Sequence, residues 1–135
     1  MTLIINNYLR RQLEGFLNNW PTEEEYGGFL IQNWRSGRVT NFLPVPNWSQ
    51  KPKEEFNPHD REKVKRLAEK LGNPVAFWHS HPTPCIMSAG DLSYASFYKD
   101  LIFVTISPLN HRWSKQYIWY ACKGVEPVEI EFIGP

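Results

Sequence analysis

Cysteine is scarce in this sequence, which has only Cys85 and Cys122 among its 135 residues. Two cysteines without Cys-x-x-Cys spacing are too few for a disulfide framework, so we expect both as thiols. Long apolar runs are also missing, and the N-terminus lacks a basic segment followed by a long apolar one. We therefore expect a cytoplasmic protein with neither a membrane span nor a secretory leader.

An excess of charge of one sign is absent as well. The 15 Lys and Arg residues nearly balance the 14 Asp and Glu residues, which gives a net charge of +1. The basic residues of segment 61–70 are interleaved with Glu62 and Glu69, a pattern typical of a solvated helix face. The charge pattern therefore gives no reason to expect nucleic acid or a membrane surface as a partner.

What the chain does have is enough apolar material for a core. Hydrophobic residues make up 41% of the sequence, and six of them are tryptophans. This composition is typical of a globular protein rather than a disordered one. The length suits one domain, so we expect residues 1–135 to fold as a single unit.

Two helices are predicted from apolar residues at helical spacing. Pro21 is expected to end the first helix, and Gly72 follows the end of the second. A turn at Asn57-Pro58-His59-Asp60 is a start signal for the second helix. The two apolar stripes are Leu9, Leu13, Phe16, Leu17 and Trp20, and Val64, Leu67, Ala68 and Leu71.

Alternating or continuous apolar runs predict the strands. Segments 26–32 and 39–45 are expected to form a hairpin around Ser36-Gly37-Arg38. The continuous apolar run 101–106 is typical of a buried central strand. Strands 116–122 and 128–132 are expected to be antiparallel. This element order predicts an α/β domain built on a mixed β-sheet flanked by helices.

The most informative stretch starts with the apolar run 75–78 and continues into His79 and His81. Side chains at i and i+2 of a strand point to the same face, so both imidazoles are expected to converge. Pro82 is expected to end this strand because it cannot donate to the sheet ladder. A helix is then expected from Ser88 to about residue 99, with Asp91 in its first turn.

Two histidines and a carboxylate would give a zinc ion three protein ligands and leave the fourth position open for water. Structural zinc sites are normally closed by four protein ligands, so this pattern favours a catalytic site. Ser88 and Asp91 also fit a helix-capping pattern, which explains both residues without chemistry. Capping and metal binding are compatible in one geometry.

The motif His79-Ser80-His81-Pro82 followed by Ser88-x-x-Asp91 resembles the signature of the JAMM (MPN-plus) zinc metalloproteases, in their compact prokaryotic JAB-type form. Their upstream glutamate before a Gly-rich strand is matched by Glu25-Tyr26-Gly27-Gly28. The resemblance implies a cytidine-deaminase-like architecture and one Zn²⁺ per chain. It also implies that His79, His81 and Asp91 bind zinc, that Glu25 is the general acid/base, and that Ser88 donates to the developing oxyanion.

The resemblance further implies an isopeptidase that cleaves after the Gly tail of a ubiquitin-like or sulfur-carrier-like protein. Activating and conjugating enzymes of such a system would be further partners. The tail needs a narrow groove near the zinc, and Trp48 and Trp113 are candidates for its rim, although packing on the core explains them equally well. Six residues separate His81 from Ser88, where the family usually has seven, which implies a tighter loop. Zinc affinity and activity would fall if this loop did not bring Asp91 to the metal.

Three other interpretations fit parts of the pattern. A non-catalytic MPN-type scaffold would typically have lost ligands, and every candidate ligand is present here. A mononuclear iron oxygenase or cupin would use His79, His81, a carboxylate and His111, but the two expected helices fit an all-β cupin poorly. A zinc nucleobase deaminase is disfavoured because Ser88 stands where the second cysteine of its Pro-Cys-x-x-Cys motif belongs. His59 and His111 have no recognisable partner spacing.

Overall fold

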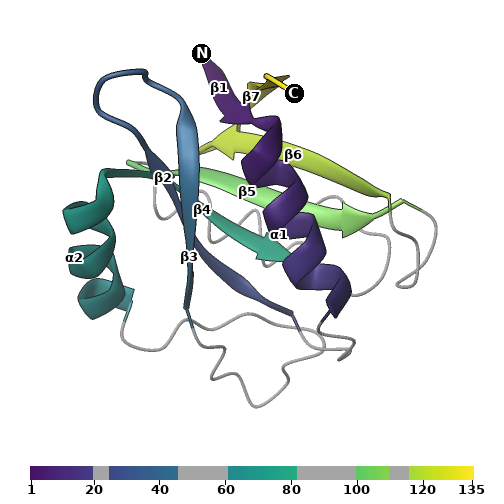
Figure 1. The fold of residues 1–135 in the computed structure, drawn as a ribbon, viewed down its shortest axis with the longest axis horizontal. Coiled ribbons are helices and arrows are strands. Elements are labelled where there is room, and N and C mark those ends of the chain that lie inside the picture. Colours follow the sequence, from purple (N-terminus) through teal and green to yellow (C-terminus); the bar gives the residue numbers. More distant parts are fainter. Residues whose placement is uncertain (20–24, 46–60, 82–99, 110–115) are drawn as a thin grey trace.

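The computed structural model describes residues 1–19, 25–45, 61–81, 100–109 and 116–135. Two helices and seven strands lie within these ranges (Figure 1). In chain order they are β1 (Thr2–Asn6), α1 (Asn7–Asn19), β2 (Gly27–Gln32), β3 (Val39–Val45), α2 (Arg61–Leu71), β4 (Asn73–Ser80), β5 (Ile102–Pro108), β6 (Tyr117–Lys123) and β7 (Glu126–Ile133). No helix in this described part of the chain is both long enough and apolar enough to cross a membrane.

The strands form one mixed sheet in the order β1-β3-β2-β4-β5-β6-β7, and this sheet closes into a barrel. β4 and β5 are parallel, whereas β2 is antiparallel to both β3 and β4. β1 closes the ring because it pairs in parallel with β7 along five residues and with β3 through Ile5 and Val39. The mixed α/β class is confirmed, but the closure differs from the open layered sheet that a cytidine-deaminase-like architecture implies.

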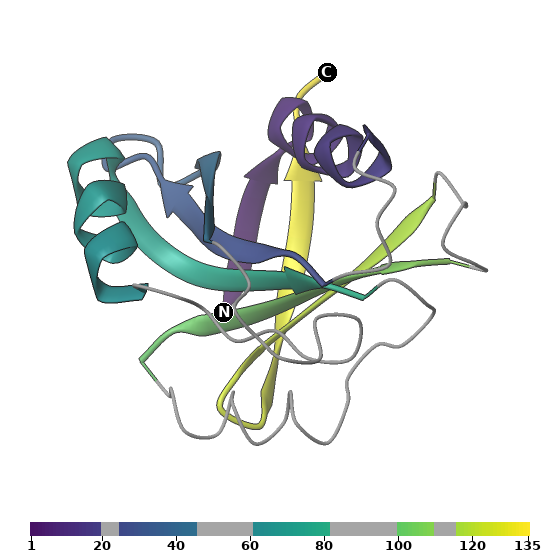
Figure 2. The ribbon, with the colours of Figure 1, turned by 90° about the horizontal axis from the view of Figure 1, so that it is seen from below.

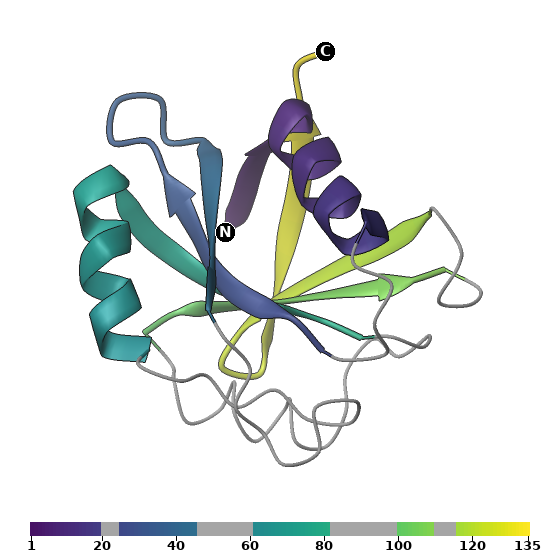
Figure 3. The same cartoon turned by 60° about the horizontal axis from the view of Figure 1, so that its bottom comes forward.

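Two apolar cores lie on the two faces of the sheet. Side chains alternate between faces along a strand, so neighbouring residues of β4 contribute to different cores. Trp78 belongs to the core that includes Leu9 and Leu13 of α1, and Phe77 belongs to the core that includes Ala68 of α2. Figures 2 and 3 show the two helices well apart, with strands between them. We call the faces of the sheet the α1 face and the α2 face.

The helix α1, the β2–β3 hairpin and the buried strand β5 confirm the sequence predictions, and Gly37 has the positive φ of 72° expected in the turn. The antiparallel pairing of β6 with β7 is also confirmed. The predicted stripe of α2 was partly wrong, because Leu67 and Leu71 are 48% and 57% exposed. Some predicted features lie outside the described residues. These are the start of α2 at 57–60, the helix that begins at Ser88, and the residues Trp20, Pro21 and Cys85.

Gly28 lies where β2 and β3 approach each other closely. A Cβ atom at this position would be 2.1 Å from the carbonyl oxygen of Leu43, which is backbone and cannot rotate away. We expect Gly28→Ala to lower the free energy of unfolding by about 1–3 kcal/mol, as overpacking of a core does. Gly15 of α1 is the control, because a Cβ there meets nothing within 4 Å. Gly15→Ala should raise the free energy by about 0.5–1 kcal/mol. Urea unfolding measures both, and equal stabilities of the two variants would contradict the structure.

Candidate metal centre

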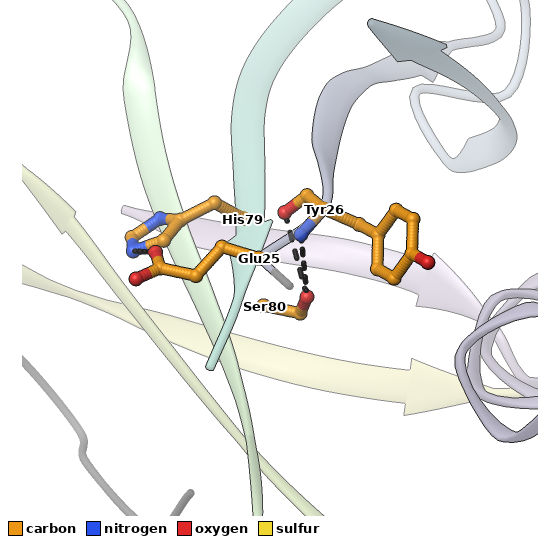
Figure 4. A network of polar contacts seen from close by, with 4 residues as sticks. All are labelled: Glu25, Tyr26, His79 and Ser80. Atoms are coloured by element: carbon orange, nitrogen blue, oxygen red, sulfur yellow. Dashed lines mark hydrogen bonds and ion pairs between the residues drawn. The ribbon is translucent and has the colours of Figure 1, made fainter. Parts of the chain in front are cut away.

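The candidate site lies on the α2 face of the sheet, at the carboxyl end of β4. His79 is the register partner of Gly27, so β2 and β4 bring their ends together here. By alternation, Glu25, Gly27 and Phe29 point to the same face as Phe77, His79 and His81. The two histidines and the glutamate therefore meet although they come from distant parts of the sequence, as Figure 4 shows for Glu25 and His79.

The three side chains are close together and buried. The ligand atoms of Glu25, His79 and His81 all lie within 4.8 Å of one another. Glu25 Oε1 is 3.8 Å from His79 Nε2, and the two imidazole rings are 4.7 Å apart between centroids. Only 3% of Glu25, 2% of His79 and 8% of His81 is exposed to solvent. Two imidazoles and a carboxylate thus converge where water is largely excluded.

The surroundings of the histidines are partly apolar. The ring of Phe103 on β5 lies 4.9 Å from that of His79, and Thr105, the register partner of His79, is fully buried. Across the sheet, Gly27 adds no side chain beside His79. Water exclusion by such walls strengthens electrostatic interactions between the carboxylate, the imidazoles and any bound cation. The burial of this cluster therefore strengthens its attraction for a bound cation compared with an exposed cluster.

Backbone hydrogen bonds hold the end of β4 on both sides. His81 donates its N–H to Ile106 O of β5 at 3.0 Å, and Ser80 donates its N–H to Tyr26 O at 2.7 Å. The N–H of Tyr26 donates in return to Ser80 Oγ at 3.0 Å (Figure 4). The strand end that carries both histidines is therefore fixed relative to β2 and β5.

The donor set fits a transition-metal ion. Neutral imidazole and carboxylate are ligands of zinc, and two buried histidines on one strand face offer two nitrogen atoms to one ion. Ligand atoms of one tetrahedral ion are about 3.3 Å apart when each bond is about 2.0 Å. The 3.8 Å between Glu25 Oε1 and His79 Nε2 is wider than this, which suits Glu25 as a carboxylate that reaches a water molecule beside the ion. The cluster can therefore hold a metal, and its chemistry agrees with zinc.

The structure brings together three of the residues singled out in the sequence, Glu25, His79 and His81. The predicted ligand Asp91 and the predicted oxyanion donor Ser88 lie outside the described residues. So do the groove candidates Trp48 and Trp113, and the remaining histidines, His59 and His111.

Sequence reasoning assigned no role to three buried polar residues near the site. Ser80 is 5% exposed, Thr105 is fully buried, and Ser107 is 3% exposed. Thr105 and Ser107 share one face of β5, the face that carries Phe103. The available signal was alternation, because two hydroxyls at i and i+2 interrupt an otherwise apolar strand. Ser80 lies inside the motif, between the two histidines.

Comparison with known proteins decides the family. The sequence profile of one family, described as prokaryotic homologs of the JAB domain, matches residues 17–117, which include Glu25, His79 and His81. The chain belongs to the prokaryotic JAB family. A comparison with curated protein sequences gave no match.

Solved structures support the same fold. A JAB1/MPN domain protein from Archaeoglobus fulgidus is 16% identical, with a TM-score of 0.64 and coverage of 98% of both chains. A protein from Desulfitobacterium hafniense is 23% identical with a TM-score of 0.74, covering 100% of this chain and 94% of its own. A Salinibacter ruber protein is 20% identical with a TM-score of 0.65, covering 98% and 92%. At these identities the likeness shows that this JAB-family chain shares their fold.

Proposed function

We propose that this JAB-family protein is a zinc-dependent peptidase or isopeptidase. Its substrate would be the amide bond after the C-terminal Gly tail of a ubiquitin-like or sulfur-carrier-like protein, either in a conjugate or in a precursor. The observation that carries the proposal is the buried convergence of Glu25 with His79 and His81, all within 4.8 Å. Two imidazoles and a nearby carboxylate supply two of the proposed metal ligands and the base that metal-assisted amide hydrolysis needs.

In this proposal His79 and His81 hold the metal together with Asp91. When bound, zinc supplies a Lewis acid and lowers the pKa of a coordinated water to about 7. Glu25 accepts a proton from the attacking water and delivers it to the leaving amine nitrogen. Ser88 donates a hydrogen bond to the oxygen on which negative charge develops. Burial of Glu25 keeps competing water away from this proton transfer.

The proposed substrate class follows from the family rather than from a bound molecule. A tail that ends in glycines has no side chains at the scissile end, so it can enter a narrow groove as an extended strand. Trp48 and Trp113 are proposed for the rim of that groove. The activating and conjugating enzymes that make such conjugates would be further partners of this protein.

The test is cleavage of a defined isopeptide. The probe is ubiquitin joined through its C-terminal glycine to lysine Nζ of a fluorescent peptide, and the control probe has its last two glycines replaced by valine. We expect the zinc-loaded protein to cleave the first probe, to lose this activity with a chelator, and to regain it when zinc is added. The valine probe should stay intact. Cleavage that persists in the chelator would contradict the metal mechanism, and zinc binding without any cleavage would favour a scaffold.

A further inference from the structure

Ser80 stands between the two histidines, and we propose that it is a positioning residue for Glu25. This inference depends on the proposed function, in which Glu25 is the acid/base. Alternation turns the Ser80 side chain away from His79 and His81, toward the α1 face of the sheet. The side chain therefore does not compete for a metal, and it is buried, with only 5% exposed. Its role has to be sought in what it contacts on that side.

The contact is with the backbone of Tyr26, the residue directly after Glu25. In a hydrogen-bonded antiparallel pair, two opposite residues exchange two backbone bonds. Ser80 donates its N–H to Tyr26 O at 2.7 Å, as the ladder requires. The return bond from Tyr26 N–H goes to the hydroxyl Oγ at 3.0 Å. Tyr26 and Ser80 lie one residue beyond Gly27 and His79, the last pair of the regular β2–β4 register. At this point the hydroxyl of Ser80 accepts the return bond.

Tyr26 is held from a second direction as well. Its ring packs edge-to-face on Phe16 of α1, with 5.7 Å between centroids. Ser80 and Phe16 together fix the backbone and the ring of Tyr26 on one face of the sheet. The neighbouring residue Glu25 then points to the other face, where His79 lies 3.8 Å away. The position of the Glu25 carboxylate is therefore set through the peptide that Ser80 holds.

One tripeptide would in this way do two tasks. His79 and His81 turn toward Glu25 on the α2 face. Ser80 between them holds the backbone of Tyr26, next to the base, as Figure 4 shows. Loss of the hydroxyl leaves the Tyr26 N–H without this acceptor and frees the chain before β2 to shift. The histidines keep their own backbone bonds, because the N–H of His81 is bound to Ile106 O. The acid/base should therefore be misplaced while the metal ligands stay in place.

Ser80→Ala is the test, made in the zinc-loaded full chain with the ubiquitin isopeptide probe. We expect kcat to fall by about 10- to 100-fold, because small misplacements of catalytic groups lower the rate by such factors. KM and zinc content should be unchanged. Ser80→Thr keeps the hydroxyl and should recover most of the rate. Ser36→Ala is the matched control, because Ser36 Oγ accepts a similar bond from Arg38 N–H at 3.2 Å in the distant hairpin. It should have the wild-type kcat.

A second measurement, by NMR, does not depend on activity. In Ser80→Ala the Tyr26 amide should exchange with solvent faster, and the nuclear Overhauser contact between Glu25 and His79 should weaken. Neither should change in Ser36→Ala. An unchanged Glu25–His79 contact, or an unchanged kcat in an active protein, would overturn the role of Ser80. If the wild-type protein cleaves nothing, the proposed function fails, and the Glu25–His79 contact alone then decides whether Ser80 positions Glu25.

Discussion

Glu25→Gln is expected to reduce kcat for isopeptide cleavage by about 10²- to 10⁴-fold, the range that general acid–base catalysis contributes. Glutamine has nearly the same shape as glutamate but cannot accept and return a proton. Because His79 and His81 are unchanged, the variant should still bind zinc and substrate. Cleavage rates, zinc content by plasma mass spectrometry and substrate affinity check the three parts of this expectation.

Glu14→Gln is the matched control for Glu25→Gln. Glu14 is a carboxylate that is only partly buried and that accepts a hydrogen bond from Trp119 Nε1 at 2.8 Å on the α1 face of the sheet. Burial raises the pKa of the Glu14 carboxyl, while the Trp119 hydrogen bond and the Arg10 charge lower it. Glutamine can accept the same bond without a buried charge, so the fold should tolerate it and the activity should remain. Wild-type turnover in Glu25→Gln would remove Glu25 from the mechanism.

His79→Ala should abolish cleavage because it removes a proposed metal ligand. Loss of residues that merely orient a ligand weakens metal binding about 10- to 100-fold, and loss of a ligand itself should weaken it further. Isothermal titration with zinc measures this difference. Since His79 is only 2% exposed, alanine also leaves a cavity, so thermal unfolding of the metal-free variants has to be compared as well.

His111→Ala provides the comparison for His79→Ala. The iron-oxygenase interpretation uses His111 as a ligand, whereas the zinc-peptidase proposal does not. Unchanged zinc affinity and cleavage in His111→Ala, together with their loss in His79→Ala, are the expected results. Equal loss in both variants would favour the alternative ligand set.

Local patterns in the sequence predicted most of the elements. Helical spacing of Leu9 and Leu13 identified α1, and both residues are buried. The same reasoning failed in part for α2, because spacing shows that Leu67 and Leu71 share a stripe but not how deeply the helix packs on the sheet. Only contacts with the sheet decide that depth, and here Ala68 is the residue of the stripe that is fully buried in the core.

Long-range pairing was the part that the sequence could not show. β1 is a short apolar segment whose strand state depends on parallel pairing with β7 at the other end of the chain. A five-residue segment carries no periodicity strong enough to reveal such a partner. Closure of the barrel was missed for this reason.

The site residues, like the elements of the fold, were predictable from the sequence only in part. That His79 and His81 share a face follows from strand alternation and needs no other information. Glu25 is the glutamate of segment 23–25 that adjoins the strand and can therefore reach the site, but its role as acid/base came only from the family resemblance. Ser80 required the structure, since its bond to Tyr26 exists only when β2 and β4 lie side by side.

The most direct test is a crystal structure of the zinc-loaded protein with anomalous scattering measured at the zinc edge. We predict one peak per chain, about 2.0–2.1 Å from one imidazole nitrogen of each of His79 and His81, with the Glu25 carboxylate beside it. Absence of a peak there at full zinc loading, or a peak only at a site away from His79 and His81, would contradict the proposed metal centre.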